Sequence, residues 1–179
     1  FEESLALKRL AGDQHGISVA LQNLCDLAHR QNDNARATAL YAEALAIRRE
    51  QADKGSIAQL LSNMGEVAIA QDAYESAHAL LEESATLCRE SGLQWVLANV
   101  SKNLGDLARI EGNYPHAQSA YREGAALFLA ANNTQGLADC VDGCASLCMR
   151  AGHAALATQL YGAAALLRET AGVSLPAIQ

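Results

Sequence analysis

The stretch NLGDLARIEGNYPHAQSAYREG, residues 103–124, decides the fold because its skeleton returns at a fixed spacing along the chain. Related stretches begin at Asn23 (NLCDLAHRQNDNARATALYAEALAI), at Asn63 (NMGEVAIAQDAYESAHALLEESATL) and, in degenerate form, at Gly143 (GCASLCMRAGHAALATQLYGAAALL). Each copy starts 40 residues after the one before, and the match needs no gap. A fixed period of this size is typical of repeat architectures in which each copy is one supersecondary unit.

Each copy predicts two helices joined by a short turn. In the second copy, apolar residues recur at helical three-to-four spacing from Ile57 to Ala68 and again from Ala77 to Leu87. The segments QNDN, QDAY, EGNY and AGHA supply the turns within copies, and ADKG, SGLQ and ANNTQG join one copy to the next. Asn, Asp and Gly tolerate the backbone angles of tight corners. Pro115 fits the first turn of a second helix, where its missing N–H is harmless.

We therefore expect an all-α fold of tandem antiparallel helical hairpins, in which each hairpin buries its apolar face against the next. The whole chain, residues 1–179, is predicted to be one solenoid fragment of a longer array. Residues 1–13 are interpreted as the second helix of a preceding copy. The copies themselves are predicted at 15–54, 55–94, 95–134 and, as a degenerate terminal copy, 135–174.

Small and bulky residues recur at equivalent places in the copies. Glycines fall on the first helix at Gly65 and Gly105, where we expect helix axes to approach within about 8–10 Å. An alanine falls on each second helix: Ala37, Ala77, Ala117 and Ala157. A bulky residue stands one turn beyond the alanine position, and we expect it to fill the space between hairpins: Phe1, Tyr41, Leu81, Tyr121 and Tyr161.

Composition and charge argue against several classes of function. Half of the residues are hydrophobic and few are aromatic, which suits helices packed through small side chains. The formal net charge of −7 argues against direct nucleic-acid binding, because a phosphate backbone is bound by clustered Lys and Arg. No apolar run approaches the roughly 20 residues that span a bilayer, so we expect no membrane segment. Five cysteines, an odd number on predicted helices, indicate a reducing, cytoplasmic location.

The motif Leu-Gly-x-x-Ala at 104–108, with Ala117 and Tyr121 at fixed distances behind it, resembles the tetratricopeptide repeat. The resemblance covers essentially the whole chain and implies a right-handed superhelix whose first helices line the concave side. Two features depart from the family: its usual period is about 34 residues, and its closing proline is missing. Cys25 and Ala145 occupy glycine positions, which small residues can do.

The long form of the repeat resembles the arrays of kinesin light chains and of spindle-orientation adaptors. The ending LYGAAALLRETAGVSLP, residues 160–176, resembles more narrowly the last repeat of large bacterial ATP-dependent transcriptional regulators of the STAND class and LuxR type. That narrower resemblance implies a helical sensor array within a multidomain regulator.

The family resemblance places ligand-binding positions on the first helices at Asn23, Asn63 and Asn103. An asparagine carries two donor hydrogens and an acceptor oxygen, so a series of asparagines can hold the backbone of an extended peptide. The alternative is that these asparagines cap or bridge neighbouring helices, since Asn otherwise weakens a helix interior.

An acidic residue follows three positions after each asparagine, on the same helix face: Asp26, Glu66 and Asp106. Asp139 and Asp142 extend this character into the fourth copy. The predicted ligand-binding face is completed by five further residues: Gln22, Gln59, Asn99, Lys102 and Arg109. Such a face favours a basic or amide-rich peptide. The alternative is a solvated polar face with intramolecular ion pairs.

One known mode of the family is not expected here. In chaperone-binding members, a lysine of the first helix grips the terminal carboxylate of the partner. The matching positions carry no lysine: Val19, Gln59, Asn99 and Asp139.

Cys140, Cys144 and Cys148 lie at four-residue intervals on one predicted helix, with His153 shortly after. A metal or redox site is conceivable, but one helix alone cannot easily surround an ion, so we expect apolar core residues instead. No phosphate-binding loop, nucleophile elbow or zinc-protease motif occurs. We expect no catalytic residues, no metal and no cofactor.

We interpret the chain as a non-enzymatic module that binds a protein or peptide on its concave face. Its predicted context is the sensor or interaction segment of a bacterial signalling and transcription regulator, with intramolecular contact to an ATPase domain as one mode of output. The alternative is a constitutive adaptor or oligomerisation scaffold, resembling kinesin light chains or spindle adaptors, which also allows homo-oligomers.

Overall fold

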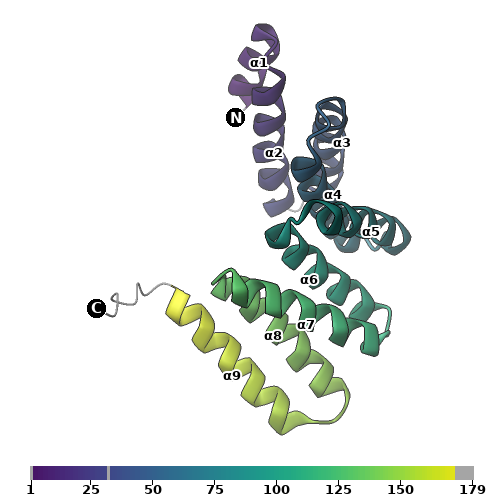
Figure 1. Ribbon diagram of the computed structural model, residues 1–179, viewed down its shortest axis with the longest axis vertical. Coiled ribbons are helices and arrows are strands. Elements are labelled where there is room, and N and C mark those ends of the chain that lie inside the picture. Colours follow the sequence, from purple (N-terminus) through teal and green to yellow (C-terminus); the bar gives the residue numbers. More distant parts are fainter. Residues whose placement is uncertain (1, 32, 172–179) are drawn as a thin grey trace. The chain divides into compact units, whose positions relative to one another are not determined.

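The computed structural model describes residues 2–31 and 33–171, except for the side chains of Asp26, His29, Arg30 and Ala171. The described residues form nine α-helices and no β-strand (Figure 1). Their bounds are α1 Glu2–Ala11, α2 Gln14–Arg30, α3 Asn34–Glu50, α4 Lys54–Ala70, α5 Tyr74–Ser91, α6 Gln94–Ile110, α7 Tyr114–Ala130, α8 Thr134–Arg150 and α9 Ala154–Ala171. The predicted all-α fold of helical hairpins is confirmed. Within the described ranges, no helix is long and apolar enough to cross a lipid bilayer.

Short turns reverse the chain between consecutive helices, and their residues have the backbone angles that the sequence predicts. The turns after α4, α6 and α7 place Asp72 at φ 57°, Gly112 at φ 79° and Asn132 at φ 53°. This left-handed region is open to Gly and accessible to Asp and Asn. Ala52 also has φ 53° in the turn after α3, a position at which the sequence shows no special residue.

Asp and Asn side chains cap several helices. Asn113 and Asn133 accept hydrogen bonds from the backbone N–H groups three residues later and so begin α7 and α8. Asp53 does the same for α4 through the N–H of Ser56. Each such cap contributes about 1 kcal/mol to helix stability. Pro115 lies in the first turn of α7, as its missing N–H requires.

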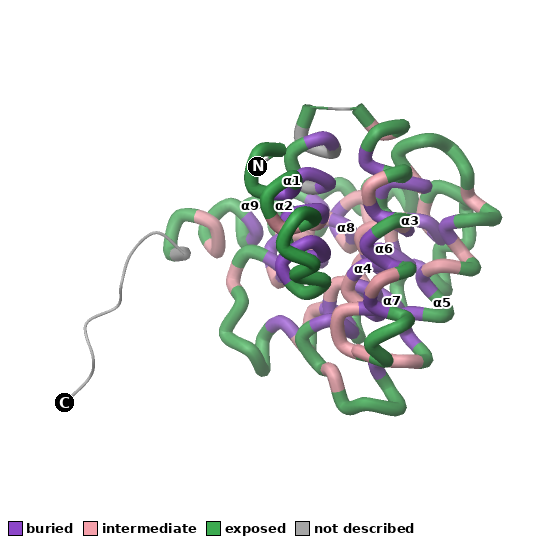
Figure 2. The backbone as a smooth tube through the Cα atoms, turned by 90° about the horizontal axis from the view of Figure 1, so that it is seen from above, coloured by how far each residue is buried: buried purple, intermediate pink, exposed green. Residues whose placement is uncertain are grey.

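The chain divides into two compact units, unit 1 at Phe1–Leu93 and unit 2 at Gln94–Gln179. In unit 1, each of the helices α1 to α5 packs on its neighbour in sequence. In unit 2, helices α6 to α9 do the same, and α6 also contacts α8, first helix to first helix. Figure 2 shows the buried residues concentrated within the helices, while the turns between them are largely exposed.

The repeated small residues lie where helices approach most closely. The alanines predicted at this contact are fully buried: Ala37, Ala77, Ala117 and Ala157. A Cβ atom added to Gly65 would lie 2.6 Å from Cδ2 of Leu81, and one added to Gly105 would lie 2.6 Å from Cδ1 of Tyr121. Only glycine therefore fits at these two places without movement of its neighbour.

Tyr121 fills the space between hairpins, as predicted. Its side chain is fully buried on α7 and meets the backbone of α6 at Gly105 and that of α8 at Gly143. Tyr161, at the equivalent position of α9, differs and is 41% exposed. Within the described residues, no helix packs over this ring from beyond α9.

Candidate interaction surfaces

In unit 1, two predicted ligand-binding residues form a hydrogen-bonded pair on α4. Gln59 and Asn63 are one helical turn apart, and Nε2 of Gln59 donates to Oδ1 of Asn63 at 2.8 Å. The pair is half-buried. Oε1 of Gln59 accepts no hydrogen bond within the described part of the chain, and it is screened from solvent. Nδ2 of Asn63 likewise has no partner there. The pair therefore presents an unused acceptor beside an unused donor.

An unused buried acceptor carries a free-energy cost. Leaving a buried polar group without a hydrogen bond costs about 1–3 kcal/mol. Oγ of Ser62, on the same helix, is also buried and without a partner among the described residues. The two oxygens lie within four residues of one helix, and a ligand reaches them only if their side chains turn outward.

The other predicted residues of unit 1 lie on α2 and α4. Asn23 is exposed and Gln22 half-buried on α2, and Glu66 is exposed on α4. The side chain of Asp26 lies outside the described residues. The role of these residues in ligand binding stays a prediction.

In unit 2, four predicted residues lie in one closed network around Tyr121. The hydroxyl of Tyr121 donates to Oδ1 of Asp106 at 2.7 Å and accepts from Nε of Arg109 at 3.1 Å. Nζ of Lys102 lies 3.0 Å from the second oxygen of Asp106 and donates to Oδ1 of Asn103 at 3.2 Å. The sequence predicted that these side chains share one helix face, but it did not predict their hydrogen bonds with Tyr121.

The environment of Tyr121 keeps its hydroxyl protonated. Burial, and then the adjacent Asp106 carboxylate, raise the pKa of the phenol well above its usual range. The hydroxyl therefore remains a donor to Asp106 at any physiological pH. The negative charge of Asp106 is in turn balanced by Lys102 and Arg109, whose nearest nitrogens lie 3.0 and 3.7 Å from its oxygens.

The acidic residues of the fourth copy are also paired within the chain. Nη2 of Arg168, on α9, lies 2.8 Å from Oδ1 of Asp139 and 2.6 Å from Oδ2 of Asp142 on α8. Asn99 donates back to the backbone oxygen of Trp95 at 3.0 Å. In unit 2, the intramolecular ion pairs that the sequence left open as an alternative are thus present.

The three asparagines of the predicted series have different environments. Asn23 is exposed, Asn63 is half-buried, and Asn103 is only 4% exposed. Asn103 is buried because α6 packs against both α7 and α8, and its oxygen is used by Lys102. Although the three asparagines occupy equivalent repeat positions, they are therefore not equally accessible to a ligand.

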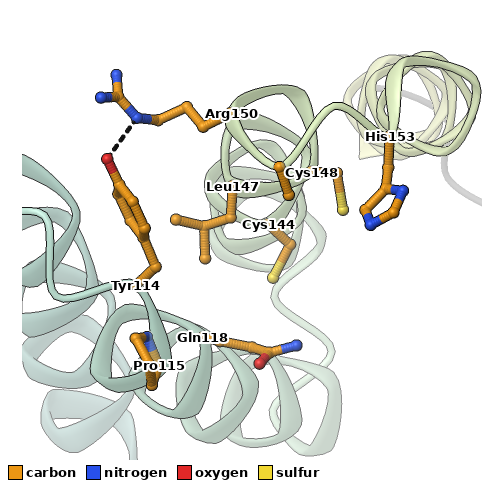
Figure 3. Close-up of a pocket in the computed structure, with 9 residues that line it drawn as sticks. Tyr114, Pro115, Gln118, Cys144, Leu147, Cys148, Arg150 and His153 are labelled. Carbon is orange, nitrogen blue, oxygen red and sulfur yellow. Dashed lines mark hydrogen bonds between the residues drawn. The ribbon is translucent and has the colours of Figure 1, made fainter.

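A separate pocket of about 380 Å³ lies in unit 2, between the start of α7, the end of α8 and the turn before α9. Figure 3 shows Tyr114 and Pro115 on one side of Leu147, and Cys148 and His153 on the other. Nε of Arg150 donates to the hydroxyl of Tyr114 at 2.7 Å. The guanidinium carbon also lies 5.4 Å from the centre of the tyrosine ring. This pair holds the rim of the pocket in place.

The cysteine stripe is divided between the core and this pocket. Cys140 is fully buried, as expected of a core residue, and burial raises the pKa of its thiol to about 12. Cys144 and Cys148 are only half-buried and line the pocket. Burial, and then Cys148, raise the pKa of the Cys144 thiol. Among the described residues, no group of three or more His, Cys, Asp and Glu side chains could hold a metal ion.

The pocket depends on residues that sequence periodicity does not single out. Tyr114 and Arg150 are 36 residues apart, and Ile110 holds the place of Arg150 in the preceding copy. This position holds Arg30 in the first copy and Ala70 in the second, so the repeat pattern gives no signal for the pair.

Taken together, these features define an all-α helical-repeat protein built from consecutive helical hairpins. Residues 56–130 match the family model for the tetratricopeptide repeat. Such repeats indicate a protein-interaction module. Among solved structures, BtubC (BKLC) from P. vanneervenii has a similar fold, with a TM-score of 0.72 and 18% sequence identity. The similarity covers 93% of this chain and 68% of that one. No curated protein matches the sequence.

Proposed function

We propose that the chain is a non-enzymatic module that binds an extended protein or peptide segment on the face of its first helices. The proposal is supported by the tetratricopeptide match and, above all, by the Gln59–Asn63 pair of α4. The pair offers one acceptor and one donor, and a peptide backbone offers an N–H and a C=O of complementary kind.

The energetics of the pair favour such a ligand. The Gln59 side chain is half-buried, so its amide has to turn outward before a backbone N–H of the ligand can donate to Oε1. That bond would remove the cost of a buried unsatisfied oxygen, which is about 1–3 kcal/mol. Recognition through backbone groups leaves the ligand's side chains free to set specificity elsewhere on the surface. In a tetratricopeptide array this face would be the concave one.

The proposed context is the sensor segment of a multidomain bacterial regulator, in which ligand binding shifts contacts with an ATPase domain. Support comes only from the resemblance of residues 160–176 to the last repeat of such regulators. A sensor requires a ligand that binds two conformations unequally. Hydrogen exchange with and without the ligand separates a sensor from a constitutive scaffold, because a sensor changes protection over several helices and a scaffold only at the contact.

A random library of 12-residue peptides panned against the chain tests the proposed surface. We expect the selected peptides to lose about 5- to 10-fold in affinity when Asn63→Ala removes one hydrogen bond of about 1 kcal/mol. Gln59→Ala should weaken them by a similar factor. Fluorescence anisotropy with labelled peptides measures both changes.

Gln159→Ala serves as the matched control, since it removes an exposed amide from α9. Its affinity for the selected peptides should equal that of the unchanged chain. Peptides whose binding is insensitive to Gln59→Ala and Asn63→Ala, but sensitive to Gln159→Ala, would place the binding surface elsewhere and contradict the proposal.

A further inference from the structure

The pocket of unit 2 differs in its charge from the rest of the molecule. The chain carries a formal net charge of −7, yet no Asp or Glu lines the pocket. The ionisable groups that line it are the thiols, a phenol and two basic side chains, Arg150 and His153. An anionic ligand is therefore opposed less here than on the remainder of the surface.

The polar groups around the pocket retain unused hydrogen-bonding capacity. Arg150 uses Nε for Tyr114, while its two terminal nitrogens have no partner among the described residues. The side-chain amide of Gln118 and the imidazole of His153 also have none in the described part of the chain. These groups contrast with Lys102 and Arg109, whose charges are paired with Asp106.

The wall between these polar groups is apolar. Pro115, Leu147 and Ala151 line it, together with Cys144 and Cys148. Burial keeps the Cys144 thiol protonated, because it raises the pKa of that thiol, and so the thiol adds no negative charge. The volume of about 380 Å³ lies in the lower part of the range of small-molecule sites, about 300–1,000 Å³.

We propose that this pocket binds a small molecule with an apolar body and one carboxylate. The body lies against Pro115, Leu147 and the two thiols, and the carboxylate is held by the free terminal nitrogens of Arg150. A guanidinium presents parallel N–H groups that match a carboxylate, and this bond is about twice as strong as a neutral hydrogen bond. The site is separate from the first-helix surface and does not depend on the function proposed for that surface.

Three probes of one shape test the charge preference: 3-phenylpropionate, 3-phenylpropanamide and 3-phenylpropylamine. The methyl resonances of Leu147 report binding by chemical shift. Protection of Cys144 and Cys148 from N-ethylmaleimide, mapped by mass spectrometry, gives a second readout at the wall. We expect affinity to fall from the carboxylate to the amide to the amine, with about 5-fold or more between the first two.

Substitutions at the rim locate the preference. Arg150→Gln should bring the carboxylate and the amide to equal affinity, whereas Arg150→Lys keeps the charge and should retain part of the difference. Arg150 is exposed, so neither change should impair folding. Arg49→Gln removes the same charge from an exposed pair with Glu83 in unit 1 and should leave the difference unchanged.

Two results would overturn the proposal. Absence of any shift at Leu147 and of any thiol protection with all three probes would show that the pocket takes no ligand of this class. Equal affinity for the carboxylate and the amide in the unchanged chain would remove the assignment of an anion to Arg150.

Discussion

The hairpins α4–α5 and α6–α7 carry an asparagine and an acidic residue in the same register, yet these residues have different partners. In α6–α7, Asp106 is held by Lys102, Arg109 and the hydroxyl of Tyr121. The corresponding positions of α4–α5 carry neither a base nor a phenol: Ser62, Ile69 and Leu81. The amides of α4 consequently bond only to one another and leave Oε1 of Gln59 without a partner among the described residues.

The comparison shows that the repeat determines the position of a polar residue on its helix. The neighbouring side chains determine whether that residue already has hydrogen-bond partners. In α6–α7 the hydrogen bonds of Asp106 and Arg109 with Tyr121 connect the two helices, so the network has a structural role. In α4–α5 the helices pack through Leu81 and through a hydrogen bond from Oγ of Ser84 to the backbone oxygen of Ala58, and Oε1 of Gln59 has no partner among the described residues.

The largest expected effect is the loss of the Tyr121 ring. Tyr121→Ala should lower the free energy of unfolding by about 3–5 kcal/mol, because it opens a cavity between α6, α7 and α8. Leu81→Ala removes packing without a hydrogen bond and should cost less, about 2–4 kcal/mol. Urea denaturation measures both. An equal or greater cost for Leu81→Ala would mean that the polar network adds nothing.

Alanine at Gly65 and at Gly105 compares how tightly the two helices pack against Leu81 and against Tyr121. Gly105→Ala presses on the ring of Tyr121 and should destabilise by about 1–3 kcal/mol. Gly65→Ala presses on Cδ2 and Cγ of Leu81, which is fully buried but smaller than a tyrosine ring, so its cost should be lower, about 1–2 kcal/mol.

Gly162→Ala is the control, since no atom lies within 4 Å of its added Cβ. It should stabilise the chain by about 0.5–1 kcal/mol through helix propensity. Thermal melting ranks the stabilities of the three variants. A larger loss of stability for Gly65→Ala than for Gly105→Ala would contradict the tighter packing against Tyr121.

Removal of the acid should matter in one hairpin and not in the other. Asp106→Asn leaves Lys102 and Arg109 without their counter-charge and should cost about 1–2 kcal/mol. Glu66→Gln changes an exposed carboxylate and should stay within about 0.5 kcal/mol. Chemical denaturation of both variants at low salt makes the comparison, and similar costs would show that α4 holds a network like that of α6.

Alkaline pH should reveal the network through Tyr121. Its folded-state pKa is raised above the unfolded value of about 10, so the folded chain keeps the proton after the unfolded chain has lost it. Stability is therefore fully present below about pH 10 and falls as pH rises further, by at most about 1.4 kcal/mol per pH unit from this group.

Tyr121→Phe should remove this part of the fall, because no group remains to titrate. Urea denaturation of both proteins between pH 9 and 11 measures the difference in slope. Parallel slopes would indicate that burial and the neighbouring Asp106 do not raise the pKa of Tyr121 in the folded chain.

The sequence predicted those features that repeat. The helical hairpins, the turn at Gly112, the close helix approach at Gly105 and the packing of Tyr121 between hairpins all follow from positions shared by several copies. The direct contact of Gly105 with Tyr121 comes from the structure. The features that it missed depend on pairs of residues that occur together in only one copy. Arg168 neutralises Asp139 and Asp142 from 29 and 26 residues away, and Arg150 meets Tyr114 from 36 residues away.

The sequence also did not predict how exposed the equivalent asparagines are. Asn23, Asn63 and Asn103 are identical by register, but their burial depends on how much neighbouring side chains cover each first helix. Periodicity carries no information on that coverage. The ligand-binding role of the first-helix face, the extent of each repeat and the regulator context remain predictions.

An NMR titration with a selected 12-residue peptide tests the role of α4 most directly, since the side-chain amide resonances of Gln59 and Asn63 can be followed individually. We expect both to shift as the peptide is added, while the side-chain amide of Asn103, buried in its network, keeps its position. A peptide that binds tightly and leaves Gln59 and Asn63 unmoved would show that the ligand is held elsewhere and that the unused groups of α4 do not serve recognition.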